Sequence, residues 1–320
     1  MSVDAAESAR LPILGLVGPT GSGKTATGIQ VALALAESGT PVEIISADAM
    51  QLYRGMDIGT AKASADEQQQ VEHHLLDLWD PQTEASVEDY QRQARVQIRE
   101  CHTRGVIPLL VGGSGLYVSS VVYDFQFPGH DPEIRAGLEA DLESSGLGPL
   151  VARLRTRDPQ VAEAVDLNNP RRVVRALEIM ELTGEAPSAS LEARGQWWHE
   201  PTVLVGLDAP REWLTQRIDA RTEAMWQAGL VDEVRGLIET GLGPTAAQAI
   251  GYREVAQMLA GEISETEART QVAQHTKRYA RKQMSWFRRD SNIHWVDASV
   301  EDAWQRVHDA FRAGLDATAH

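Results

Sequence analysis

The chain has 320 residues, 42% of them hydrophobic and 24% charged, which is ordinary for a globular protein of about two domains. Its single cysteine, Cys101, excludes an intramolecular disulfide and a zinc site built on several cysteines, and so favours a reducing compartment. The net charge of −16 argues against a nucleic-acid partner, although residues 269–289 hold seven Lys or Arg and no acid.

No segment of the sequence is suited to crossing a membrane or to directing secretion. No stretch approaches the ~18–20 consecutive apolar residues that a membrane span requires. The first ten residues lack the basic start and the apolar run of a secretory signal. We therefore expect a cytoplasmic protein.

Short apolar runs alternate with helical patterns along most of the chain. Strands are expected at 13–17, 42–46, 107–111, 203–207 and 293–296. Helices are expected at 25–36, 86–101 and 116–122, and again throughout 211–289. Strands that alternate with helices predict an α/β fold, in which a parallel sheet carries helices on both faces.

The segment between 131 and 184 has a different character. It shows helical spacing, no convincing strand, and Asp-Pro or Asn-Pro pairs of the kind that begin helices. We interpret it as a helical insertion into the α/β core. The expected parts are the first part of the core at 1–127, the insertion at 128–187 and the second part of the core at 188–320.

A phosphate-binding loop follows the first expected strand. The segment GPTGSGKT fits the pattern G-x4-G-K-[ST] and opens an expected helix, which is the context that the pattern requires. Backbone N–H groups of such a loop face phosphate oxygens, Lys24 adds a full positive charge, and the Thr25 hydroxyl is suited to ligating Mg²⁺. A diphosphate or triphosphate is the expected ligand of Gly18, Pro19, Thr20, Gly21, Ser22, Gly23, Lys24 and Thr25.

The sequence lacks two features of nucleotide-hydrolysing proteins. The strand at 107–111 ends in Gly112-Gly113 and not in an acid that would hold Mg²⁺ or position water. No Asn-Lys-x-Asp pattern is present to read guanine. The acid that does follow an apolar strand is Asp48, and the residues alone leave it open whether Asp48 is a general base or a helix cap or outer Mg²⁺ ligand.

Seven separated motifs resemble those of the tRNA dimethylallyltransferase family, also called tRNA isopentenyltransferases or IPP transferases. They occur in the family's order and span nearly the whole chain. The motifs are GPTGSGKT at 18–25, ISADAMQLYRGMDIGTAK at 45–62, HHLLDLWDP at 73–81, LLVGGSGLY at 109–117, NNPRRVVRALEI at 168–179, IGYREV at 250–255 and KRYARKQMSWFRR at 277–289.

The resemblance implies a fold, a reaction and partners. The fold would be a parallel-sheet core like that of P-loop NTPases, with an inserted all-helical domain that contacts tRNA. The enzyme would transfer a dimethylallyl group from dimethylallyl diphosphate to N6 of the adenosine at position 37, 3′ of the tRNA anticodon. The phosphate loop would hold the diphosphate leaving group and not ATP. Mg²⁺ as cofactor, the tRNA anticodon stem-loop as partner and a monomeric state are also implied.

The resemblance assigns roles to individual residues. Asp48 would be the base, and Arg135 would neutralise the diphosphate, although the residues alone favour a solvated helix arginine at 135. Thr20 is expected to orient the amine or the diphosphate because it lies inside the phosphate loop. Apart from the resemblance, Arg217 and Arg221 are four positions apart on an expected helix and could reach the diphosphate like the lid arginines of small kinases, although the residues alone slightly favour surface pairs with neighbouring acids. Contacts with tRNA are expected from Asp48, Ala49, Met50, Gln51, Ser114, Arg135, Arg171, Arg172, Val173, Val174, Arg175, Lys277, Arg278, Arg281 and Lys282.

Three positions depart from the family pattern. Ser114 replaces a threonine but keeps a hydroxyl, Ala49 replaces the serine that follows the base, and Ala63 replaces a proline. None of these changes removes a charged group, so they bear on local substrate contacts and not on the reaction.

Two other classes of function stay open at this stage. A phosphate loop on an α/β core also fits a small-molecule kinase, which would consume ATP and ignore RNA. A basic helix at 277–289, with cationic residues three and four positions apart, also fits an RNA-binding module without catalysis, or a merely solvated surface. A relative that prenylates free AMP is disfavoured by the two basic clusters, at 171–175 and 277–289.

Overall fold

The computed structural model describes residues 11–184 and 196–318, which form two compact units. The first unit comprises the described residues up to 122 together with those from 199 onward, and the second lies between 123 and 198. The insertion was expected to start at 128, and the second unit already begins at Tyr123. The end expected for it, at 187, lies outside the described residues.

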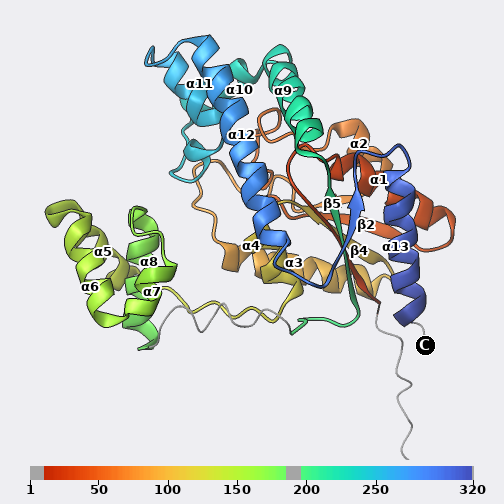
Figure 1. The fold of residues 1–320 in the computed structure, drawn as a ribbon, viewed down its shortest axis with the longest axis horizontal. Coiled ribbons are helices and arrows are strands. Elements are labelled where there is room, and N and C mark those ends of the chain that lie inside the picture. Colours follow the sequence, from red (N-terminus) through yellow and green to blue (C-terminus); the bar gives the residue numbers. More distant parts are fainter. Residues whose placement is uncertain (1–10, 185–195, 319–320) are drawn as a thin grey trace, which may run out of the picture. The chain divides into compact units, whose positions relative to one another are not determined.

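The first unit is built on a six-stranded sheet with the order β3-β2-β4-β1-β5-β6 (Figure 1). Every pair of neighbouring strands is parallel, which confirms the predicted α/β fold. The strands are β1 Ile13–Val17, β2 Val42–Ser46, β3 His73–His74, β4 Ile107–Gly112, β5 Thr202–Asp208 and β6 Ile293–Asp297.

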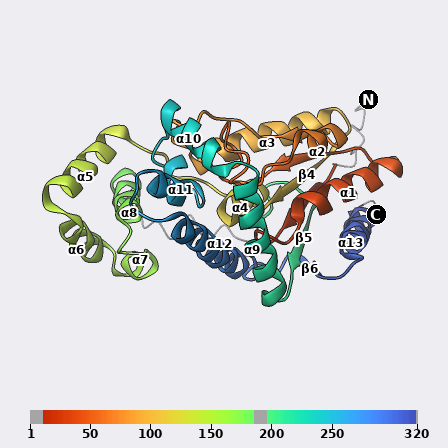
Figure 2. The same ribbon diagram turned by 90° about the horizontal axis from the view of Figure 1, so that it is seen from above.

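Helices cover both faces of this sheet (Figures 1 and 2). Leu14 and Leu16 of β1 belong to a buried cluster with α1 and α13, whereas Tyr90 of α3 donates a hydrogen bond to the Ser46 carbonyl of β2. Within the described ranges, no helix is both long and apolar enough to span a membrane. The helices of this unit are α1 Lys24–Glu37, α2 Ala65–Gln70, α3 Val87–Thr103, α4 Gly115–Val122, α9 Arg211–Gln227, α10 Leu230–Thr240, the 3-10 helix η2 Ala246–Gln248, α11 Tyr252–Leu259, α12 Glu265–Phe287 and α13 Ala303–Thr318.

Helices α9 to α12 pack with the loop that follows β2. Tyr53 and Met56 of this loop are fully buried in a cluster with apolar residues of these helices. The Glu233 carboxylate accepts hydrogen bonds from the backbone N–H groups at 57–59 and from the Tyr252 hydroxyl. The loop is therefore fixed from the helical side, and its residues 60–63 form part of a cavity wall.

The second unit is helical, as the insertion was predicted to be. Its helices are α5 Pro132–Ser145, α6 Leu147–Arg157, α7 Pro159–Ala164 and α8 Pro170–Thr183. Asp131, Asp158 and Asn169 accept hydrogen bonds from backbone N–H groups in the first turns of α5, α7 and α8, each of which begins with proline. Buried residues such as Leu138 and Leu177 give the unit its own apolar core.

Candidate functional site

Three strand ends converge at one edge of the sheet. The phosphate loop follows β1, Asp48 follows β2, and β4 ends at Gly112, which Gly113 follows. Because the strands are parallel, their carboxyl ends meet at the same edge, where α/β proteins bind ligands. A Cβ atom on Gly112 would lie 2.2 Å from the carbonyl oxygen of Ala47, so the turns after β2 and β4 are in direct backbone contact.

The phosphate loop has the backbone conformation that its glycines predict. Gly21 and Gly23 have positive φ angles of 86° and 90°, which residues with a side chain rarely adopt. Helix α1 begins at Lys24, so the partial positive charge of the helix N-terminus lies at the loop. The loop therefore has a backbone conformation that suits a phosphate cradle.

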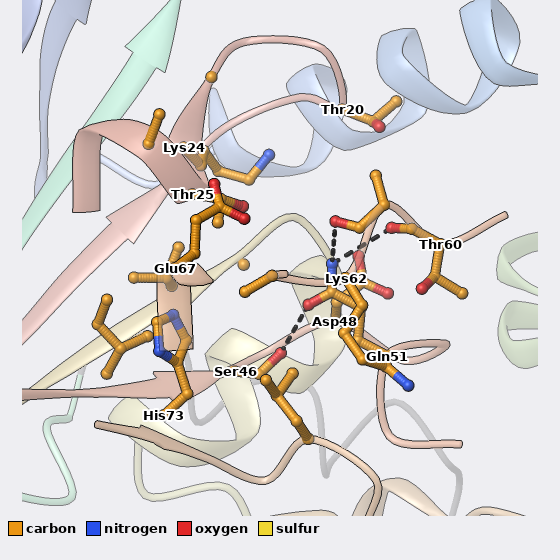
Figure 3. Close-up of a pocket in the computed structure, with 18 of the residues that line it drawn as sticks. Thr20, Lys24, Thr25, Ser46, Asp48, Gln51, Thr60, Lys62, Glu67 and His73 are labelled. Carbon is orange, nitrogen blue, oxygen red and sulfur yellow. Dashed lines mark hydrogen bonds between the residues drawn. The ribbon is translucent and has the colours of Figure 1, made fainter. Parts of the chain in front are cut away.

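A cavity of about 440 Å³ opens beside this loop. Its wall combines segments that are far apart in the sequence (Figure 3). The polar and charged residues that line it are Thr20, Lys24 and Thr25 from the phosphate loop and α1, Ser46, Asp48 and Gln51 from the end of β2 and the following loop, Thr60, Lys62, Glu67 and His73 from the loop, α2 and β3, Arg217 and Arg221 from α9, and Gln283 from α12.

Arg217 and Arg221 both face the phosphate loop. Arg221 donates a hydrogen bond to the Thr20 hydroxyl at 2.7 Å, and Arg217 donates one to the Gly21 carbonyl at 2.8 Å. The surface pairing that the sequence slightly favoured is wrong, because Asp219 pairs with Lys277 and Glu223 pairs with Arg269. A helix pattern cannot show which face of α9 meets a loop some 200 positions earlier.

Positive charge in the cavity is partly stripped of water. Burial lowers the pKa of Lys24 to about 8, an effect that the Asp48 carboxylate offsets in part and the Arg221 guanidinium adds to. Burial also lowers the pKa of Arg221. Removing water from a cation disfavours its charged form, so an anion that enters here gains strongly from these groups.

Asp48 presents one carboxylate oxygen to the cavity. Oδ1 accepts a hydrogen bond from the Met50 N–H at 2.9 Å, which fixes the side chain. Oδ2 has no hydrogen-bond partner among the described residues. A half-buried carboxylate with one free oxygen can accept a proton from a ligand, as a general base must.

Residues 51 and 62 form a rigid part of the wall. The Gln51 side-chain amide accepts from the Ser46 hydroxyl and donates to the carbonyls of Thr60 and Ala61. The Lys62 ammonium, 3% exposed, donates to the Tyr53 carbonyl and to the Asp77 carboxylate. The sequence did not predict a role for Lys62. Because its ammonium already bonds to oxygens of the protein, its positive charge stabilises the loop that follows β2.

The three departures from the family pattern lie at this site. The Ser114 hydroxyl accepts a hydrogen bond from the Ala49 N–H at 3.1 Å and lies 3.3 Å from the Tyr279 hydroxyl. Ser114 is 7% exposed, and its hydroxyl links the turn after β4 to the residue that follows Asp48. Ala63 is buried and lines the cavity beside Lys62.

The donor set fits a magnesium ion accompanied by phosphate. The Thr25 hydroxyl lines the cavity and makes no hydrogen bond to another described residue, and the Asp48 carboxylate lines the same cavity (Figure 3). Oxygen ligands, few of them from the protein and the others from phosphate, are typical of Mg²⁺.

A second group of metal-ligand atoms lies on β2, β3 and α3. Ligand atoms of Glu43, His74 and Cys101 lie within 4.8 Å of one another. The hydrogen bonds from Arg104 lower the pKa of Glu43 to about 2, and burial raises the pKa of the Cys101 thiol to about 11. A carboxylate already paired with arginine and a thiol that resists ionisation indicate a structural cluster.

Helix α12 carries the basic residues that the sequence singled out. Lys277 pairs with Asp219, with an Nζ–Oδ1 distance of 2.6 Å, so its charge is largely neutralised. Arg278, Arg281 and Lys282 are exposed and pair with no acid among the described residues. The free positive charge of this helix therefore lies in these three residues and not in the predicted four.

The second unit holds the remaining predicted residues. Arg135 and Arg175 both lie at the fully buried Glu178, with shortest distances of 3.7 Å and 2.9 Å. Arg171 and Arg172 are exposed and pair with no acid in the part of the chain that the structure describes. The side chains of Val173 and Val174 are buried in the core of the unit, which leaves outward contacts to the flanking arginines.

Gln283 is a cavity residue that the sequence analysis missed. It comes from α12, more than 160 positions after the other turns that it contacts, and is 4% exposed. Four basic residues precede it and Trp286 follows it in the sequence. A glutamine in a basic helix is typical of a solvated surface, so this pattern did not indicate a buried residue at the cavity.

Comparison with known proteins gives one family. The profile of the IPP transferase family matches residues 51–290. A protein of Kineococcus radiotolerans named tRNA dimethylallyltransferase is 52% identical over 291 residues, which cover 90% of this chain and 91% of the relative. One of the same name from Clavibacter sepedonicus is 49% identical and covers 94% of this chain and 98% of its own.

Solved structures agree with the sequence relatives. The tRNA isopentenylpyrophosphate transferase of Bacillus halodurans is similar with a TM-score of 0.70 at 38% identity, over 96% of this chain and 98% of that one. A eukaryotic dimethylallyltransferase described as acting on tRNA has a TM-score of 0.76 at 25% identity, over 95% of this chain and 77% of that one.

The lowered pKa of Lys24 leads to a pH prediction. Inorganic pyrophosphate should bind the protonated form, so its affinity should fall by up to about tenfold per pH unit as the pH rises above the Lys24 pKa of about 8. Calorimetric titration of the wild type and of Lys24→Arg, which keeps its charge, would separate this effect from the titration of pyrophosphate itself. A ratio of the two affinities that stays constant across this pH range would contradict the prediction.

Proposed function

This chain belongs to the IPP transferase family, and we propose that it is a tRNA-modifying prenyltransferase. It transfers a dimethylallyl group from dimethylallyl diphosphate to N6 of the adenosine at position 37 of tRNA. The products are diphosphate and N6-(dimethylallyl)adenosine. The observation that carries the proposal is that a phosphate cradle and a carboxylate with a free oxygen line one cavity, beside a β4 strand end that has no acid.

The phosphate side of the cavity suits the leaving group. When the allylic C–O bond breaks, its electron pair goes to the diphosphate, which gains negative charge. Lys24, Arg217 and Arg221 line the cavity around the loop and stabilise that charge as it develops. Since burial penalises the charged forms of Lys24 and Arg221 when no anion is present, the attraction of these two groups for diphosphate is greater than it would be in water.

The opposite side of the cavity suits the acceptor. The exocyclic amine of adenosine forms a C–N bond to the allylic carbon and must lose one proton. Asp48 Oδ2 takes that proton, while Oδ1 stays bonded to the Met50 N–H and keeps the side chain oriented. The Thr20 hydroxyl, which accepts from Arg221, lies on the phosphate side of the same cavity.

Magnesium belongs to the proposal as a cofactor. Thr25 would hold the ion together with oxygens of the diphosphate, and the Asp48 carboxylate lines the same cavity. When bound, Mg²⁺ supplies additional positive charge that favours departure of the diphosphate.

The exposed cations suit an RNA partner. Arg278, Arg281 and Lys282 on α12 and Arg171 and Arg172 on α8 lack acidic partners among the described residues, in a chain with a net charge of −16. Unpaired cations gathered on helices attract phosphates of a nucleic-acid backbone. The adenosine would have to leave its stack to reach a cavity lined by Asp48 and the phosphate loop.

A labelled-transfer assay tests the proposed function. The protein is incubated with unmodified tRNA, Mg²⁺ and dimethylallyl diphosphate labelled in the prenyl group, and label in RNA is counted. We expect label to enter RNA with an adenosine at position 37 and not RNA with a guanosine there. Absence of label in RNA, together with ATP turnover on a small molecule, would favour the kinase alternative and overturn the proposal.

The cations of α12 generate a salt prediction. Arg281→Ala should weaken tRNA binding and make the slope of log affinity against log salt shallower by about one, because one phosphate contact is lost. Arg306→Ala on α13 is the matched control, since that exposed arginine pairs with Asp302. Equilibrium binding at several salt concentrations measures both slopes, and equal slopes for wild type and Arg281→Ala would exclude this contact.

A further inference from the structure

Gln283 connects helix α12 to two of the turns that build the cavity. Its Oε1 accepts a hydrogen bond from the Thr20 N–H in the phosphate loop at 2.8 Å. Its Nε2 donates one to the Gly113 carbonyl in the turn after β4, also at 2.8 Å. Because one partner is a donor and the other an acceptor, the amide can satisfy both in only one orientation.

The turn after β4 is shaped to receive this side chain. A Cβ atom on Gly113 would lie 2.3 Å from Gln283 Nε2, and a Cβ atom on Gly115 would lie 2.3 Å from the Trp286 ring. The Trp286 N–H donates to the Ser119 hydroxyl at 3.2 Å, and the Tyr279 hydroxyl lies 3.3 Å from that of Ser114. Residues 279, 283 and 286 therefore form one face of α12, which is docked on the segment 113–119.

The turn after β4, to which Gln283 donates a hydrogen bond, also contacts the segment that carries Asp48. Gly112 contacts the Ala47 carbonyl so closely that no Cβ atom fits, and the Ser114 hydroxyl accepts from the Ala49 N–H. The residues on either side of Asp48 are thus fixed by the same turn. On its other side, Gln283 fixes Thr20, whose hydroxyl is held by Arg221.

We propose that Gln283 is a positioning residue that sets the phosphate loop and Asp48 at the separation which the transfer reaction requires. The proposal rests on the proposed function for its chemistry, since it assigns the loop to the leaving group and Asp48 to the amine. Gln283 bridges the two sides through its side-chain amide and is 4% exposed. The exposed face of the same helix, with Arg278, Arg281 and Lys282, stays free for RNA.

Replacing the amide by a hydrocarbon of similar size tests this role. In Gln283→Leu the Thr20 N–H and the Gly113 carbonyl lose their partner. We expect the single-turnover transfer rate, with both substrates saturating, to fall between about tenfold and hundredfold, because small misplacements of reacting groups have effects of this order. The dissociation constant of inorganic pyrophosphate should rise by at least about threefold, because the loop loses one anchor.

Two variants serve as controls for packing and for folding. Gln274→Leu changes an exposed glutamine of the same helix and should behave as the wild type. Gln283→Met, with an unbranched side chain of similar length, repeats the test in case leucine disturbs the fold. Affinity for tRNA should stay within about twofold in all three variants, since the cationic face is unchanged.

The outcomes separate this proposal from the proposed function. A Gln283 variant that keeps both the wild-type rate and the wild-type pyrophosphate affinity would overturn the positioning role. A variant that loses tRNA affinity in parallel with rate would also overturn it, because a loosened helix would then explain the defect. If the wild type itself transfers no label, the proposed function fails, and the pyrophosphate affinity alone decides whether Gln283 positions the loop.

Discussion

The site depends on the close approach of backbone at the carboxyl ends of β1, β2, β4 and β5. A Cβ atom on Gly18 would lie 2.7 Å from the Leu207 carbonyl, and one on Gly112 would lie 2.2 Å from the Ala47 carbonyl. Main chain therefore packs on main chain, and the sheet provides the frame within which the buried Gln283 amide bridges the phosphate loop and the turn after β4. Such preorganisation is what charge stabilisation in a reaction requires.

This rigid frame brings positively charged side chains together at one cavity, although the chain as a whole is negatively charged. In a protein with a net charge of −16, Lys24, Arg217 and Arg221 face one cavity with Asp48 among them. Burial lowers the pKa of Lys24 and of Arg221, which means that their charged forms are disfavoured until an anion arrives. The affinity for phosphate groups is thus a local property, and the acidic balance of the surface does not oppose it at this short range.

Local sequence patterns predicted most of the strands and helices, but they did not predict contacts between residues that are far apart in the sequence. The phosphate loop, the strand ends and the capped helices of the second unit follow from glycine spacing, apolar runs and Asx-Pro pairs. β3 has two residues and α2 has six, too few to show a period, and α13 was not among the predicted elements. Gln283 lies 263 and 170 positions from its two partners, so only the folded chain shows its role.

The role of Asp48 is the central claim, and the rate of the chemical step tests it most directly. In Asp48→Asn, the amide can still accept from the Met50 N–H, but it cannot take a proton from the adenine amine. With tRNA and dimethylallyl diphosphate both saturating, we expect the single-turnover rate to fall by about 10²–10⁴-fold, while tRNA and pyrophosphate still bind. A variant that transfers the prenyl group at the wild-type rate would show that Asp48 is not the base.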